Sequence, residues 1–88
     1  MDREAFIGLL AAEQFDVVVT VQQPANGALD VHTHAFEAKA LIVEGAMWIA
    51  IGDTEQAYQV GQVFYLSANA PHSERYGPAG VTYLVGRK

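Results

Sequence analysis

From Phe15 onward the chain consists of short apolar runs separated by turn residues, a pattern that restricts it to an all-β fold. Valine, isoleucine and aromatic residues, which favour strands, recur in these runs. About eight runs are expected to form strands: 15–22, 29–33, 39–43, 47–51, 54–60, 63–66, 72–76 and 81–85. Turns are expected between them, including 44–45, 52–53 and 77–78. Short strands at this regular spacing predict a sandwich or a barrel.

Residues 3–14 form the one segment with helical periodicity. Phe6, Leu9 and Leu10 recur at helical spacing, and Asp2 is in position to cap the amino end. A helix of this length is marginal by itself in water, so its apolar stripe must pack against another element. We therefore expect a short N-terminal helix followed by a barrel over residues 15–87, as a single domain spanning residues 1–88.

Length, charge and cysteine content restrict the partners. A domain of 88 residues often depends on a metal ion, disulfides or self-association, and this chain has no cysteine. A formal charge of −5 argues against nucleic acid and anionic membranes as partners. The first residues lack the basic region and long apolar run of a signal peptide, and no apolar run approaches the ~20 residues of a membrane span. We expect a cytoplasmic location.

Several predicted strands are apolar on both faces, which favours self-association. One run places Met47, Ile49 and Ile51 on one side and Ala46, Trp48 and Ala50 on the other. In a two-layer β-domain only one face of each sheet is covered from within, and the helix can cover only part of the second face. A second copy of the chain is the simplest cover, so we expect a homodimer.

All three histidines lie at two places in the chain. His32 and His34 are two residues apart on a predicted strand and therefore point to the same face, whereas His72 follows Pro71 at the start of a later strand. An isolated pair of this kind also occurs on ordinary strand surfaces. Three imidazoles together would bind a divalent transition metal (Fe, Zn, Ni, Mn or Cu) and leave coordination positions open.

The segments around these histidines resemble the two motifs of the cupin superfamily. Residues 32–45, HTHAFEAKALIVEG, are similar to the first motif, in which HxH is followed by a carboxylate and an apolar strand that ends in glycine. Residues 61–72, GQVFYLSANAPH, are similar to the second, which ends in Pro-His. The resemblance covers residues 27–85. It implies a cupin-type double-stranded β-helix, a jelly-roll barrel, in which His32, His34 and His72 bind the metal.

The chain departs from these motifs at the carboxylate. In the family the carboxylate lies seven positions before the motif glycine. In this chain that position is Ala38, and the acid Glu37 lies one position earlier. Strand alternation turns Glu37 away from His34 unless a β-bulge near Phe36 restores it. Both a three-histidine site and a site that includes Glu37 therefore stay open.

Two further residues are candidates by alternation from His72. Glu74 shares its face and could be a fourth ligand or a general base, and Tyr76 could direct its hydroxyl toward a bound molecule. The ordinary alternatives are an exposed charge on an edge strand for Glu74 and a filler of the barrel mouth for Tyr76.

The resemblance does not specify an activity, because cupins include many enzymes as well as proteins without catalytic activity. One hypothesis is a metal-dependent enzyme, dioxygenase- or isomerase-like, that acts on a small polar molecule inside the barrel. The alternatives are a non-enzymic domain that senses or binds a metal or small ligand, and a structural metal site that stabilises a small barrel.

Overall fold

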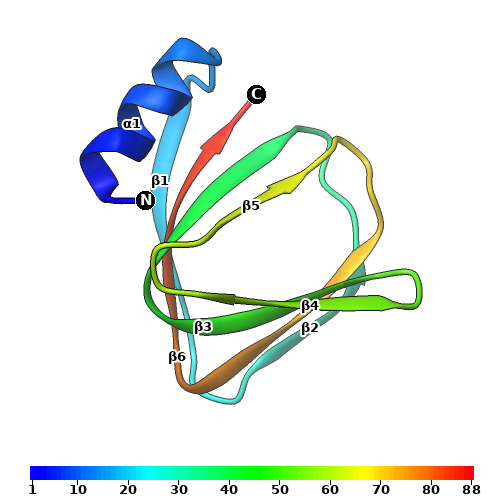
Figure 1. Cartoon of the computed structure of the whole chain (residues 1–88). Helices are drawn as coiled ribbons and strands as arrows, with labels where there is room; N and C mark the ends of the chain where they lie inside the picture. Colours follow the sequence, from blue (N-terminus) through cyan, green and yellow to red (C-terminus); the bar gives the residue numbers. More distant parts are fainter.

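A computed structural model describes all 88 residues, as one helix and six strands. The elements are α1 (Arg3–Ala12), β1 (Val17–Gln23), β2 (Ala28–His32), β3 (Ala38–Ile51), β4 (Thr54–Gln59), β5 (Val63–Leu66) and β6 (His72–Arg87). The strands curl into a barrel, and α1 lies outside it, beside β1 and the carboxyl end (Figure 1). The structure is all-β with one short helix, as the sequence predicts.

The long strands β3 and β6 form the centre of the sheet. They pair antiparallel with each other, and each uses its two halves to pair with two different short strands. β6 pairs with β2 along its first half and with β1 along its second. β3 pairs with β5 along its first half and with β4 along its second. This arrangement lets two long strands hold the whole barrel together.

Both long strands bend at a shared corner. Gly45 in β3 and Gly80 in β6 have φ values of 73° each, which glycine adopts without the steric cost of a side chain. A Cβ atom on Gly45 would lie 2.0 Å from the carbonyl oxygen of Gly80, so the two backbones are in direct contact. Residues 77–80 have no partner in the registers of β6, and Pro78, which lacks an N–H, is tolerated there.

The turns predicted at residues 44–45 and 77–78 are therefore wrong. The runs 39–43 and 47–51 belong to one strand, β3, and the runs 72–76 and 81–85 belong to β6. Six strands replace the expected eight or so. Glycine gives the same local sequence signal at a bulged corner, where pairing continues, as at a turn, where pairing ends.

The helix covers the outer face of the barrel where β3 and β6 pair. The carboxylate of Asp2 caps it by accepting a 2.8 Å hydrogen bond from a backbone N–H of the first turn. Phe6 and Leu10 are buried against Phe15, Leu41 and Leu84, which confirms that the apolar stripe packs. The helix ends two residues earlier than expected. It falls well short of the length and apolarity that a membrane crossing demands.

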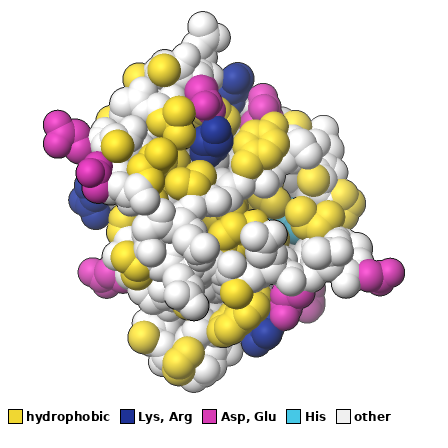
Figure 2. Space-filling view, in the orientation of Figure 1, with side chains coloured by type: hydrophobic (Ala, Val, Ile, Leu, Met, Phe, Trp, Pro, Cys, Tyr) yellow, Lys and Arg dark blue, Asp and Glu magenta, His cyan; other side chains and the backbone are white.

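The second and larger apolar cluster fills the barrel interior. It comprises Ala38, Ala40, Ile42, Met47, Ile49, Phe64, Leu66, Tyr76, Val81 and Val85. On the outer face Trp48 is half-buried, and the guanidinium of Arg75 lies 4.1 Å from the centre of its ring. Exposed apolar side chains are scattered over the surface, as the yellow groups in Figure 2 show. The homodimer stays a prediction.

We expect Gly45→Ala to abolish folding or to lower the free energy of unfolding by several kcal/mol, because the new methyl group would collide with the backbone of Gly80. Urea unfolding followed by circular dichroism measures the effect. Gly52→Ala is the matched control, since Gly52 also has a positive φ of 59° but has open space around it. The control should cost only about 1–2 kcal/mol. Similar losses in the two variants would show that the corner does not depend on close backbone approach.

Candidate metal centre

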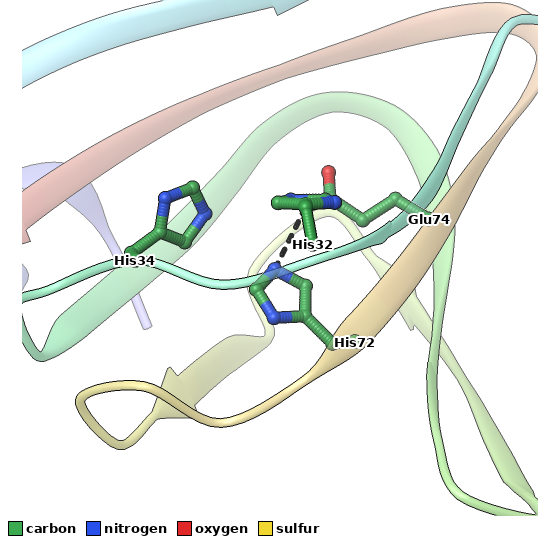
Figure 3. Close-up of side chains that lie close together, drawn as sticks. All are labelled: His32, His34, His72 and Glu74. Atoms are coloured by element: carbon green, nitrogen blue, oxygen red, sulfur yellow. Dashed lines mark hydrogen bonds and ion pairs between the residues drawn. The ribbon is translucent and has the colours of Figure 1, made fainter.

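The pairing of β2 with β6 brings the histidines together. His32, the last residue of β2, is the register partner of His72, the first residue of β6. Glu74 follows two residues later on the same face of β6, and His34 lies in the segment just after β2. Figure 3 shows the four side chains converging from these two segments. The loop that carries His34 is fixed by a hydrogen bond from the backbone N–H of Asn69 to the carbonyl of His34.

The four side chains offer one ligand atom each within 4.8 Å of one another. The ring centres of His32 and His72 lie 4.3 Å apart, and His34 lies 5.0 Å from His32 and 5.1 Å from His72. Oε2 of Glu74 lies 3.2 Å from Nε2 of His72 and 3.3 Å from Nε2 of His32. The sequence prediction of three convergent histidines therefore matches their arrangement in space, with a carboxylate among them.

Two backbone carbonyls set the orientation of two of the rings. Nδ1 of His32 lies 2.7 Å from the carbonyl oxygen of Asp30, and Nδ1 of His72 lies 2.9 Å from that of Ala70. A carbonyl can only accept, so both Nδ1 atoms carry protons and donate them. In the neutral ring Nε2 is then the atom with the free lone pair. Both Nε2 atoms face Glu74, in the arrangement that second-shell hydrogen bonds give to metal-binding histidines.

This geometry leaves a polar atom without a partner. Nε2 of His32 is buried and has no hydrogen bond, since its approach to Glu74 has the distance of an ion pair but not the angles of a hydrogen bond. A lone pair on Nε2 and a carboxylate oxygen repel each other unless a cation lies between them. Ligand atoms about 2.1 Å from one ion are at most about 4.2 Å apart, so the most distant pair of the group would need to approach by at least about half an ångström. These residues could hold a metal ion.

Glu74 is held in place from its other side. It is 8% exposed, and its Oε1 accepts a 3.1 Å hydrogen bond from the hydroxyl of Tyr76. Burial, together with Glu74, raises the pKa of Tyr76, so the hydroxyl remains a donor at neutral pH. Tyr76 itself is 4% exposed within the interior cluster and orients Glu74 rather than reaching into open space. Glu74 is thus not an exposed edge charge.

Glu37 lies outside the group. Its Oε1 accepts a 2.6 Å hydrogen bond from the hydroxyl of Tyr65. The structure therefore does not bring Glu37 to the histidines, in keeping with the alternation that turned it away from His34. The carboxylate among the histidines is Glu74, supplied by β6, whereas the resemblance expects it at position 38 of β3.

His34 differs from the other two histidines in its surroundings. Its ring stacks on Phe36 with a centre-to-centre distance of 5.0 Å and an interplanar angle of 23°. Burial, followed by the neighbouring His72 and His32, lowers the pKa of His34 from its ordinary value of 6.5. The ring is therefore neutral at pH 7, the state in which a histidine can bind a metal.

A cavity of about 60 Å³ lies inside the barrel beside this group. Seven of its ten lining residues are apolar, and the remaining ones are His34, Glu74 and Arg87. Sequence reasoning missed Arg87, because the last strand was expected to end at residue 85. Alternation from the inward Val81 and Val85 would have placed residue 87 on the same face had that strand been extended.

Comparison with known proteins bears on the fold. No protein-family model matches the chain, and neither does any curated protein sequence. Solved structures do match. An RmlC-like cupin from Shewanella frigidimarina is similar over 81% of this chain and 64% of its own, with 15% identity and a TM-score of 0.69. The chain has a cupin fold.

Enzymes are among the cupin-fold structures that resemble this chain. The DMSP lyase DddQ from Ruegeria pomeroyi matches with 21% identity over 81% of this chain and 36% of its own, with a TM-score of 0.73. The oxalate decarboxylase OxdC from Bacillus subtilis matches with 18% identity over 81% of this chain and 20% of its own, also at 0.73. The chain spans less than two thirds of the length of the proteins that it matches.

Acid should destabilise the metal-free protein partly through His34. The imidazole of His34 takes up a proton less readily in the folded chain than in the unfolded chain, in which its pKa is near 6.5. Below about pH 7 the unfolded state therefore binds more protons, and the free energy of unfolding falls as the pH falls. Urea unfolding at pH 7.0, 6.0 and 5.5 should show a smaller fall for His34→Gln than for the parent protein. Equal falls would mean that His34 titrates alike in both states.

Proposed function

We propose that this cupin-fold chain binds one divalent transition metal ion through His32, His34, His72 and Glu74, and acts there on a small polar molecule. The observation that carries the proposal is the position of Oε2 of Glu74, 3.2 and 3.3 Å from two Nε2 atoms whose rings are fixed by backbone carbonyls. Hydrogen bonding within the chain does not satisfy all of these atoms, as the buried Nε2 of His32 demonstrates.

Burial supports the choice of a metal ion over a purely structural polar cluster. The side chains of His72 and Glu74 are 1% and 7% exposed, so water cannot readily screen the charge on the carboxylate. With both rings neutral, the hydroxyl of Tyr76 is the hydrogen-bond donor to that carboxylate, because Nε2 of His72, 3.2 Å away, donates only in a ring that carries its proton there. One such bond offsets only part of the cost of burying the carboxylate. A cation bound by three neutral imidazoles and Glu74 would compensate it fully.

Each residue has a role that follows from its contacts. Asp30 and Ala70 fix the rings of His32 and His72 through their carbonyls, and Tyr76 fixes Glu74. The apolar lining of the cavity excludes water, which strengthens electrostatic interactions with a bound molecule. When bound, a divalent ion with four protein ligands supplies a Lewis acid and open positions for a substrate group.

Protein purified without chelator should contain close to one transition metal ion per chain, measured by inductively coupled plasma mass spectrometry. Glu74→Gln should weaken metal affinity at least about tenfold, because it removes the negative charge while keeping the shape of the side chain. His72→Ala should lose the metal, since it removes the most deeply buried imidazole of the group, which is 1% exposed.

Glu37→Gln is the matched control, because Glu37 is a neighbouring acid that the structure pairs with Tyr65 instead. Its metal affinity should equal that of the parent protein. Unchanged affinity in Glu74→Gln, or a large loss in Glu37→Gln, would contradict the proposed ligand set.

Catalysis is one of two roles that such a site can have, and a binding or sensing domain is the second candidate. The size of the cavity favours the second role for some ligands: about 60 Å³ accommodates roughly four to six water-sized groups, which is little room for a large substrate. The same volume suits an enzyme whose substrate is a very small molecule, and several structures with this fold belong to enzymes.

Turnover separates the two roles. Protein loaded in turn with ferrous iron, manganese, nickel and zinc is incubated with small hydroxy acids, keto acids, diketones, thiols and phenols. Products are followed by NMR, and oxygen consumption by an electrode. For the enzyme we expect metal-dependent conversion of at least one compound that Glu74→Gln abolishes. Saturable binding without conversion across the panel would establish the binding role instead.

A further inference from the structure

Arg87 is the one charged side chain at the cavity whose pairing is incomplete. It is the last residue of β6, and none of the ion pairs or side-chain hydrogen bonds of the structure involves it. Its Nε is buried and has no hydrogen-bond partner. A buried N–H of a charged group that lacks an acceptor is costly, so its retention calls for a ligand that supplies the acceptor.

The guanidinium is held in position by an aromatic ring. Its central carbon lies 4.9 Å from the centre of the Phe36 ring, which also stacks on His34. Phe36, His34 and Arg87 all line the cavity. Stacking restricts the plane of a guanidinium while leaving its N–H edge free for a planar acceptor. The ring of Phe36 therefore contacts both His34, a proposed metal ligand, and the guanidinium of Arg87.

The sheet register explains why no residue of the chain neutralises Arg87. Ala38 of β3 is its direct register partner, and directly paired residues place their side chains close enough to interact. A carboxylate at position 38 would lie beside the guanidinium. Because alanine is present, position 38 supplies no partner for the charge, and Ala38 contributes space to the cavity.

We propose that Arg87 binds the carboxylate of a small organic acid that occupies this cavity. This inference rests on the proposed function only where it orients the acid toward the metal. The free Nε–H and a neighbouring Nη–H form the side-on fork that binds both oxygens of a carboxylate. The other end of the acid is directed toward His34 and Glu74, which line the cavity with Arg87. At about 60 Å³ the cavity limits the acid to roughly four to six non-hydrogen atoms.

The test uses zinc-loaded full-length protein, labelled with ¹⁵N and titrated with acetate, glycolate and pyruvate. Acetamide and glycolamide, which have the same shape without the charge, are the ligand controls. The chain has three arginines, so the Nε–H resonance of Arg87 is assigned by its loss from the spectrum of Arg87→Lys. We expect this resonance to shift saturably with at least one acid and not with the amides. If none of the three arginine Nε–H resonances shifts with any of the acids, the proposal is overturned without requiring a variant to fold.

Calorimetry on variants provides the second measurement. Arg87→Gln should bind the acid about 10- to 100-fold more weakly than the parent protein, because a charge-assisted bidentate contact is lost. Arg75→Gln is the matched control: it removes one arginine that pairs with Glu55 on the outer surface, and its affinity should be unchanged. Equal affinity in Arg87→Gln and the parent protein would contradict the proposal.

Metal content measured on the same samples separates this proposal from the proposed function. If zinc binds stoichiometrically and no acid binds, the role of Arg87 is overturned while the metal site stands. If zinc does not bind, the titration is repeated on metal-free protein. An acid that then shifts the Arg87 resonance supports the anion site alone, and the absence of a shift overturns it.

Discussion

The pairing of β3 with β6 is the constraint on which both the barrel and the candidate site depend. Arg87 lies thirteen positions after Glu74, a distance of about 43 Å along a straight strand. Both nevertheless line one cavity of about 60 Å³. The corner at Gly45 and Gly80 achieves this, because it folds each long strand back over the interior while the pairing on either side continues. A single backbone contact thus decides which side chains meet.

The buried carboxylate is the second element of this organisation, and its position has consequences for its neighbours. Glu74 lies on the same face of the same strand as His72 and Tyr76, so β6 alone supplies a proposed ligand, its carboxylate neighbour and the hydroxyl that orients this carboxylate. A carboxylate on β3 at position 38 would instead face Arg87. Because the carboxylate is on β6 and not on β3, its negative charge lies among the histidines, and the positive charge of Arg87 faces the cavity.

Local periodicity predicted the strands and the residues that share a face, whereas the cupin fold and the meeting of His72 with the other two histidines were predicted from the resemblance to the cupin motifs. Residues two apart on a strand share a face, which relates His32 to His34 and His72 to Glu74 without any knowledge of the topology. Sequence reasoning could not choose between Glu37 and Glu74, since that choice depends on the pairing of β2 with β6. It placed turns at residues 44–45 and 77–78, because glycine in a bulged corner and glycine in a turn look alike. The position of Arg87 at the cavity was missed because β6 was expected to end at residue 85, and strand ends are poorly specified by local sequence.

Charge balance connects the proposed metal ligands to the rest of the cavity. With three neutral imidazoles and a divalent ion, the carboxylate of Glu74 compensates one of the two positive charges, and Arg87 adds another. Seven of the ten lining residues are hydrophobic and carry no charge that could compensate this excess. In such surroundings electrostatic interactions are stronger than in water, so a neutral ligand would leave the positive charge unbalanced at a high cost. An anion that reaches both the ion and the guanidinium removes that cost, and the small volume limits how large it can be. The arrangement proposed to bind the metal would thereby also select the charge and the size of the molecule that binds beside it.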